Sequence, residues 1–245
     1  MGAGACVTKT PLESSTSTIV VHGVLNAGVD DQVVAVQRTT GGAPQAAPVD
    51  SATVTIIGPD GVAMTGVEVD DSLFTRVYRI RLSSYGETLI AGGTYRLRVH
   101  LRSGEEVTGS TTVPNGVAAP PPTPAGDVLT PGRDTLRLSW PRVPGASSYE
   151  VRVQSKSAVY AMFADTSVVL PANLRSFAGT PVFTSLTNNV VVVSAVDAAY
   201  YQYYRTTSDE FTGATVQGNL SGAEGVFGSL VIVAMRTFYM AAATH

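Results

Sequence analysis

The chain has 245 residues, a formal net charge of -3 and a charged fraction of 14%, well below the roughly 25% of an average soluble domain. With 44% hydrophobic residues, it is neither an intrinsically disordered chain nor a coiled coil, and its acidic balance argues against nucleic acid as a partner. Valine and threonine supply 63 of the residues, and glycine and proline supply 38. Branched residues together with many turn formers favour an all-β fold.

The N-terminal segment, residues 1–17, predicts a tether. Small residues precede the lone Cys6, as at the end of a bacterial lipoprotein signal, although the positive and apolar regions of such a signal are missing. The stretch that follows is rich in Ser, Thr and Pro, which is typical of a flexible segment. Two interpretations stay open: Cys6 carries a lipid anchor, or it is a free cysteine in a disordered tail. A single cysteine excludes an intrachain disulfide and a cysteine-based zinc site.

Residues 18–113 predict a first β-sandwich domain. Apolar and polar residues alternate along short segments with turns between them, which is the pattern of antiparallel sheets with one solvated face. The sequence Gly-Pro-Asp-Gly at 58–61 is a strong turn signal, because proline presets φ and glycine accepts a positive φ. The predicted strands cover residues 18–25, 32–38, 52–57, 77–82, 94–102 and 106–113.

A proline-rich stretch, residues 114–133, interrupts this pattern and predicts a polyproline II linker between two domains. Residues 134–245 then predict a second sandwich. A strand that ends in Trp140, a Pro-Gly-Ala turn and the run Tyr-Glu-Val-Arg-Val at 149–153 resemble a fibronectin type III domain, and this resemblance implies a tryptophan buried between two sheets. The apolar stretch 226–240 is too short and too polar to cross a bilayer, so we expect a buried strand there.

The order of these features resembles one particular family. A cysteine and tether, a sandwich with the 58–61 turn, a Trp-bearing sandwich, the run 195–204 and a glycine-rich segment at 218–228 follow one another along the chain. This order is similar to that of the DUF4249 family of bacterial cell-envelope lipoproteins, whose function is uncharacterised. The resemblance covers most of the chain and implies an extracytoplasmic, membrane-associated location in the periplasm or cell envelope. The family has no assigned catalytic residues, so none is transferred.

Residues that commonly carry catalysis are sparse in this sequence. Histidine is the commonest general base, but His22 is expected to be a satisfied structural residue on a strand, and His100 lies among arginines on an exposed face. The glycines at 218–228 lack the Lys-Ser/Thr of a phosphate loop and are expected in turns and bulges. We therefore expect no catalytic residues, no metal site and no cofactor. Three adjacent acidic pairs fall in predicted turns, at 30–31, 70–71 and 105–106.

Arginines form the sharpest local feature. If the predicted strands 77–82 and 94–102 pair as a hairpin, five arginines share one exposed face. Guanidinium groups bind carboxylate or phosphate in a bidentate geometry, so the functional interpretation is a surface that docks an acidic protein or lipid headgroups. The alternative is a solvated face that nearby acidic residues balance. The five residues are Arg79, Arg81, Arg96, Arg98 and Arg102.

Four tyrosines lie within five residues, and we expect them on a strand. One pair would then face the core and the other pair the solvent, because side chains alternate along a strand. Three interpretations of the cluster stay open: core packing, an anchor at a protein interface, or a platform for stacking sugars. Tyr201 and Tyr203 would share one face, and Tyr200 and Tyr204 the other.

Together these patterns predict an all-β fold of two tandem antiparallel β-sandwiches, Ig-like or fibronectin III-like, joined by a Pro-rich linker. The predicted function is a non-catalytic, extracytoplasmic accessory or scaffolding subunit that binds other proteins at the membrane surface. One candidate setting is the periplasmic side of a large bacterial membrane complex such as a photosynthetic reaction centre. The alternative is a free-standing envelope lipoprotein that binds a glycan or peptide. The expected partners are a membrane protein complex and, through a lipid on Cys6, the membrane surface.

Overall fold

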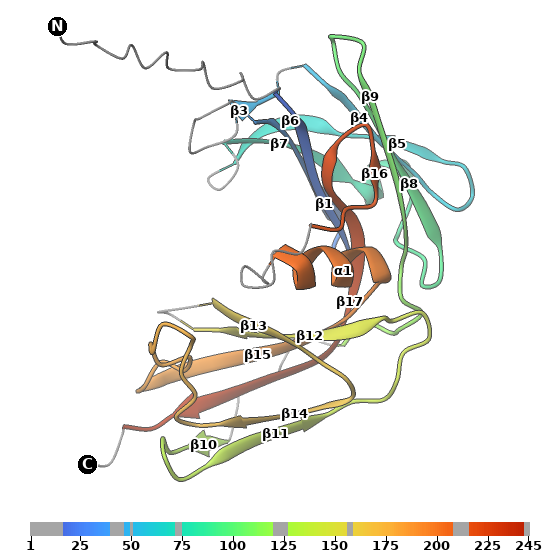
Figure 1. Cartoon of the computed structure of the whole chain (residues 1–245). Helices are drawn as coiled ribbons and strands as arrows, with labels where there is room; N and C mark the ends of the chain where they lie inside the picture. Colours follow the sequence, from blue (N-terminus) through green and yellow to red (C-terminus); the bar gives the residue numbers. More distant parts are fainter. Residues whose placement is uncertain are drawn as a thin grey trace, which may run out of the picture.

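The computed structural model describes residues 17–39, 47–49, 51–71, 75–119, 127–155, 159–207 and 216–242. Within these ranges the chain forms β-strands, one short 3₁₀ helix and one α-helix (Figure 1). The first half contains β1 (Ile19–Ala27), β2 (Asp31–Arg38), β3 (Ala47–Pro48), β4 (Thr53–Ile57), β5 (Ala63–Thr65), β6 (Val67–Asp71), β7 (Thr75–Arg81), η1 (Leu82–Tyr85), β8 (Thr94–His100) and β9 (Glu106–Thr112). The second half contains β10 (Val128–Leu129), β11 (Thr135–Ser139), β12 (Ser148–Gln154), β13 (Val159–Ala164), β14 (Ser167–Pro171), β15 (Thr187–Val196), α1 (Ala198–Thr207), β16 (Leu220–Ser221) and β17 (Glu224–Met240).

The all-β prediction is confirmed, and the strands build two sandwiches around one long sheet (Figure 1). The long sheet has the order β13-β12-β15-β17-β1-β2-β7-β6, with β10 beside β17 and β3 beside β2. The five-stranded sheet β16-β9-β8-β4-β5 packs against one end of it, and the two-stranded sheet β11-β14 packs against the other. Each sandwich therefore has its own hydrophobic core.

Strand β17 belongs to both sandwiches. Its first residues pair in parallel with β1, from Glu224 opposite Val20 onwards, while the rest of the strand pairs antiparallel with β15. Phe227 is fully buried in the first core, and Phe238 is fully buried in the second. One continuous strand thus joins the two cores, which the sequence patterns do not predict. The division into domains at the Pro-rich linker stays a prediction, and residues 120–126 of that linker lie outside the described residues.

Several local predictions are confirmed. Strand β8 alternates exposed and buried side chains along its whole length, with Tyr95, Leu97 and Val99 in the core. The turn at 58–61 closes through a 3.0 Å hydrogen bond from the Gly61 amide to the Gly58 carbonyl. Trp140 is buried in the second core, where its indole N–H donates to the Asp165 carbonyl at 3.1 Å. The strand expected over 226–240 is the main part of β17; residues 226–229 are buried as predicted, whereas residues 232–235 are half-buried and Arg236 is exposed.

The predictions of strand direction and of the tyrosine run are wrong. The sheets are not antiparallel throughout, because β1 and β10 each pair in parallel with β17. A parallel pair needs a long connection between its strands, and the long chain segments between these strands provide it. The tyrosine run lies on helix α1 rather than on a strand. Asp197 caps this helix, since its Oδ1 accepts the Tyr200 amide at 2.9 Å. No helix in the described part of the chain is long and apolar enough to cross a membrane.

Candidate functional site

The five arginines do not share one face, because the predicted hairpin does not form. Strand β7 pairs with β2 and β6 in the long sheet, whereas β8 pairs with β4 and β9 in the five-stranded sheet. Alternation of apolar and polar residues fixes which face of a strand is buried, but it leaves the identity of the partner strand open. Arg79 and Arg81 therefore lie on the outer face of one sheet and Arg96 and Arg98 on that of the other, with Arg102 in the turn after β8.

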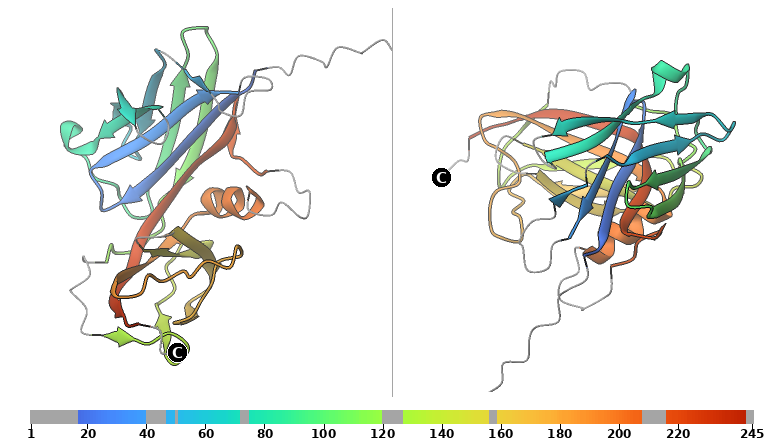
Figure 2. Two further views of the ribbon diagram at one scale, coloured as in Figure 1. Left: turned by 90° about the vertical axis from the view of Figure 1, so that its left-hand side faces the viewer. Right: turned by 90° about the horizontal axis from the view of Figure 1, so that it is seen from above.

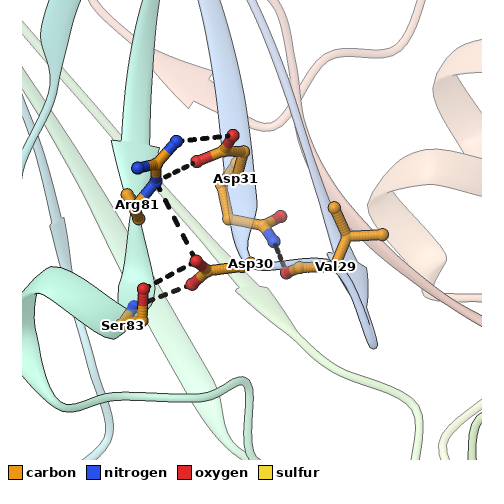
Figure 3. A network of polar contacts seen from close by, with 6 residues as sticks. Val29, Asp30, Asp31, Arg81 and Ser83 are labelled. Carbon is orange, nitrogen blue, oxygen red and sulfur yellow. Dashed lines mark hydrogen bonds and ion pairs between the residues drawn. The ribbon is translucent and has the colours of Figure 1, made fainter.

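Arg81 belongs to a polar network at the end of β7 (Figure 3). Its Nε donates to Asp31 Oδ1 at 3.0 Å, and this hydrogen bond is the main reason that the pKa of Asp31 lies below its usual range. Asp30 accepts from the amide and the hydroxyl of Ser83 at 2.7 and 2.6 Å, which lowers the pKa of Asp30 as well. These contacts tie β2, β7 and η1 together, so Arg81 has a structural role.

Helix α1 lies at the waist between the sandwiches, on the outer face of the long sheet (Figure 2). Gly228 of β17 permits this close approach, since a Cβ at that position would lie 3.1 Å from the Tyr200 backbone nitrogen. The side chain of Tyr200, a residue of α1, is buried between the helix and the sheet, and its hydroxyl donates to Glu150 Oε1 at 2.9 Å. The same carboxylate oxygen accepts from Arg152 at 3.0 Å. Burial, followed by the nearby Glu150 charge, raises the pKa of Tyr200.

The other three tyrosines are half-buried and fasten the same helix. Tyr204 stacks on Tyr200 one turn away, with 4.4 Å between ring centroids, and its hydroxyl contacts His22 Nε2 of β1. Tyr203 packs edge-on against Tyr204 at 5.3 Å, and Tyr201 packs edge-on against a phenylalanine of β13 at 5.0 Å. Burial lowers the pKa of His22, which favours the neutral ring in this contact. His22 is the satisfied structural residue that the sequence predicts; a binding role for the tyrosines stays a prediction.

A buried carboxylate that the sequence reasoning missed lies where the two sandwiches meet. Asp197 Oδ2 accepts from the hydroxyl of Thr111 in β9 at 2.6 Å, and its Oδ1 accepts from the amide of Ser229 in β17 at 3.2 Å. Burial raises the pKa of Asp197, although these hydrogen bonds act in the opposite direction. The signal that could have found this residue is an Asp directly before Ala-Ala-Tyr, which is a helix N-cap pattern.

Two cavities border helix α1. One, of about 570 Å³, lies between the sandwiches, and its lining includes Ser147, Gln202, Gln217 and the carboxylate of Asp197. The other, of about 600 Å³, lies between α1, β1 and β17 and includes Tyr203 and Glu224. Among the described residues, no group of three or more His, Cys, Asp or Glu could hold a metal ion. Cys6 lies outside the described residues.

The third surface of interest is the outer face of the five-stranded sheet, where Arg96 and Arg98 are exposed. Arg98 Nε forms a 3.0 Å ion pair with Glu106 across to β9. A shallow groove of about 440 Å³ lies over both arginines and is lined on one side by Thr108 and Ser110 of β9. This groove is rich in hydrogen-bond donors, so it suits anionic groups.

The sequence matches the family model described as a domain of unknown function, DUF4249, over residues 8–235. Because this match covers most of the chain, the protein belongs to the DUF4249 family, and the resemblance read from the order of its motifs is confirmed. The family description assigns no activity, substrate or partner. A search of curated proteins returns no match.

Solved structures similar to this chain include fibronectin type III domains. A two-domain fibronectin type III segment of chicken tenascin is 15% identical, with 74% of this chain and 92% of that chain covered and a TM-score of 0.25. The chicken CNTN1 FN1-FN3 domains are 13% identical, with 92% and 69% covered and a TM-score of 0.22. Pullulanase from Anoxybacillus sp. LM18-11 is 9% identical, with 72% and 24% covered and a TM-score of 0.27. These TM-scores are low, so the fold assignment rests on the strand pairing and the two cores of this chain.

Proposed function

We propose that this protein is a non-catalytic accessory or scaffolding subunit that binds other proteins at the membrane surface, outside the cytoplasm. Two β-sandwiches in tandem are an architecture suited to protein interaction, and the residues at the waist serve packing. His22 Nε2 is engaged by Tyr204, and the carboxylate of Asp197 is engaged by hydroxyl and amide donors. The partner we propose is a large membrane protein complex, contacted from its periplasmic side.

The observation that carries this proposal is the continuity of β17 through both cores. Further hydrogen bonds cross the waist: the Asn115 amide donates to the Pro144 carbonyl at 2.8 Å, and the Ala119 amide donates to the Ile232 carbonyl at 2.7 Å. Two sandwiches held in one orientation form a preorganised surface, which loses little conformational freedom on binding. A scaffold between partners benefits from this stiffness.

A pull-down from native membranes tests the proposal. The chain carries a C-terminal tag, mild detergent releases its complexes, and mass spectrometry identifies what co-purifies. Stoichiometric recovery of an integral membrane complex is the expected result. Recovery of the chain alone, with a diacylglyceryl mass on Cys6, contradicts the proposal and favours a free-standing lipoprotein. The Cys6→Ala variant separates the roles of a lipid and of protein contacts, because a protein-bound subunit retains its partner without the anchor.

A second candidate function is binding of a glycan or peptide, and the cavity between the sandwiches favours it. Ligand sites occur preferentially at such junctions, and the uncharged side chains Gln202 and Gln217 can donate to and accept from a neutral polar ligand. A glycan and peptide array tests this candidate. Binding that the double variant Gln202→Ala/Gln217→Ala abolishes supports it, and an array without a reproducible signal rejects it.

A further inference from the structure

The outer face of the five-stranded sheet carries two arginines of β8 with hydroxyl side chains beside them. Strand β8 turns Arg96 and Arg98 outward, each between buried neighbours. Thr55 of β4 and Thr108 of β9 lie opposite Arg98 in register, while Ile57 of β4 and Ser110 of β9 lie opposite Arg96. We call the surface formed by the two arginines and the three hydroxyl residues the β8 face. Cations in the centre and hydroxyls on both sides make it a surface of hydrogen-bond donors.

The charge on the β8 face is only partly neutralised. Glu106 pairs with Arg98 at 3.0 Å, but both side chains remain more than half exposed. Within the described part of the chain, no ion pair involves Arg96. The shallow groove of about 440 Å³ lies over both arginines and leaves their guanidinium groups accessible. The face can therefore accept carboxylates from a partner.

The spacing of the two arginines indicates what kind of partner fits. Alternate residues on a strand are about 6.6–6.8 Å apart, and alternate side chains of any extended peptide repeat at the same distance. Acidic side chains at alternate positions of an extended segment therefore match Arg96 and Arg98. Polar side chains of that segment can bond the hydroxyls of β4 and β9.

From this match we propose that the β8 face docks an extended segment of a partner protein with Asp or Glu at alternate positions. This inference rests on the proposed function and names the surface and the chemistry of the partner. Attraction to an anionic lipid surface takes clusters of roughly four to eight basic residues. The β8 face presents two arginines with hydroxyl side chains beside them, which favours a protein segment.

Fluorescence anisotropy with labelled peptides at low ionic strength tests the proposal on the full chain. One peptide alternates Glu and Thr, and a second has the same composition with its glutamates in one block. The test variant is Arg96→Gln/Arg98→Gln. The matched control is Arg79→Gln/Arg137→Gln, which removes the same charge from exposed side chains on other surfaces.

The alternating peptide is expected to bind more tightly than the blocked peptide, and added salt is expected to weaken it. The test variant weakens this binding by about fivefold to tenfold, because exposed ion pairs each contribute a modest free energy. The control variant changes it by less than about twofold. Equal affinity for both peptides overturns the spacing argument. An equal loss of affinity in the control variant overturns the proposal, because it shows that binding depends only on net charge. Tighter, arginine-dependent binding to phosphatidylglycerol vesicles overturns the choice of a protein partner.

The membrane pull-down separates this inference from the proposed function. If the unaltered chain and the Arg96→Gln/Arg98→Gln variant recover the same partner equally well, the proposed function stands and the docking role of the β8 face is wrong. If the unaltered chain binds the alternating peptide but recovers no protein from membranes, the β8 face stands and the proposed function fails. Loss of the partner in the test variant alone supports both.

Discussion

Replacing Phe227 with alanine tests whether β17 makes the two sandwiches one cooperative unit. The Phe227 side chain is fully buried in the first core. Its ring lies over Gly23, where a Cβ would be 3.2 Å from Cδ2 of Phe227. Because Gly23 has no side chain that could move into the space, the cavity left by Phe227→Ala collapses poorly. We therefore expect a loss in the upper part of the range for such substitutions, about 4–5 kcal/mol.

Urea unfolding followed by tryptophan fluorescence provides the assay. Trp140 is the one tryptophan of the sequence, and it lies in the second core. If β17 couples the cores, a cavity in the first sandwich moves the Trp140 transition. With a urea dependence of ~3 kcal/mol per M, the midpoint falls by more than about 1 M. Hydrogen exchange of the β8 amides reports on the first sandwich in the same samples.

A surface substitution supplies the control. Phe177 is 98% exposed in the second sandwich, so Phe177→Ala is expected to change the unfolding free energy by less than about 0.5 kcal/mol. The reasoning is refuted if Phe227→Ala accelerates exchange in β8 while the Trp140 transition stays where it is. That pattern would show two sandwiches that unfold independently despite the shared strand.

Three further predictions concern the waist. Thr111→Val removes the hydroxyl that donates to Asp197 and should lower the unfolding free energy by about 1.5–3 kcal/mol; an unchanged midpoint would contradict the junction described above. Gly228→Val places a side chain against the backbone of α1 and should cost about 1–3 kcal/mol with a changed near-ultraviolet circular dichroism spectrum. Burial lowers the pKa of His22, so its contribution to stability is complete above pH 6.5 and is lost as the pH falls through the folded-state pKa. His22→Gln should flatten the pH dependence of thermal stability below about pH 6.5, and a melting temperature that falls as steeply with pH in this variant as in the unaltered chain would contradict the prediction.

The alternation of apolar and polar residues predicts the strands well where one face is buried and the other is exposed to solvent. Strand β8 shows this plainly, since its buried Leu97 lies between two exposed arginines. The turn at 58–61 and the buried Trp140 could also be predicted, because they depend on local turn chemistry and on a recognisable core pattern. These features are set by a few neighbouring residues.

Long-range pairing could not be predicted in the same way. The residues of β7 and β8 do not indicate that β7 joins the long sheet and β8 the five-stranded sheet. For this reason the predicted hairpin of these two strands is wrong. The tyrosine run was misplaced because aromatic residues favour strands on average, while the cap at Asp197 and the room left by Gly228 fix a helix there. The sharing of β17 likewise depends on pairing with β1, about two hundred residues earlier in the chain.

Site-specific photo-crosslinking in native membranes tests the central claim, that this chain binds a protein through its β8 face, most directly. A photoreactive amino acid replaces Thr108, which is exposed beside Arg98, and in a second variant it replaces Ser139, which is exposed on β11 of the other sandwich. The account predicts one discrete crosslinked protein from position 108 and none from position 139. Crosslinks to lipid alone at position 108, or the same protein from both positions, would contradict it.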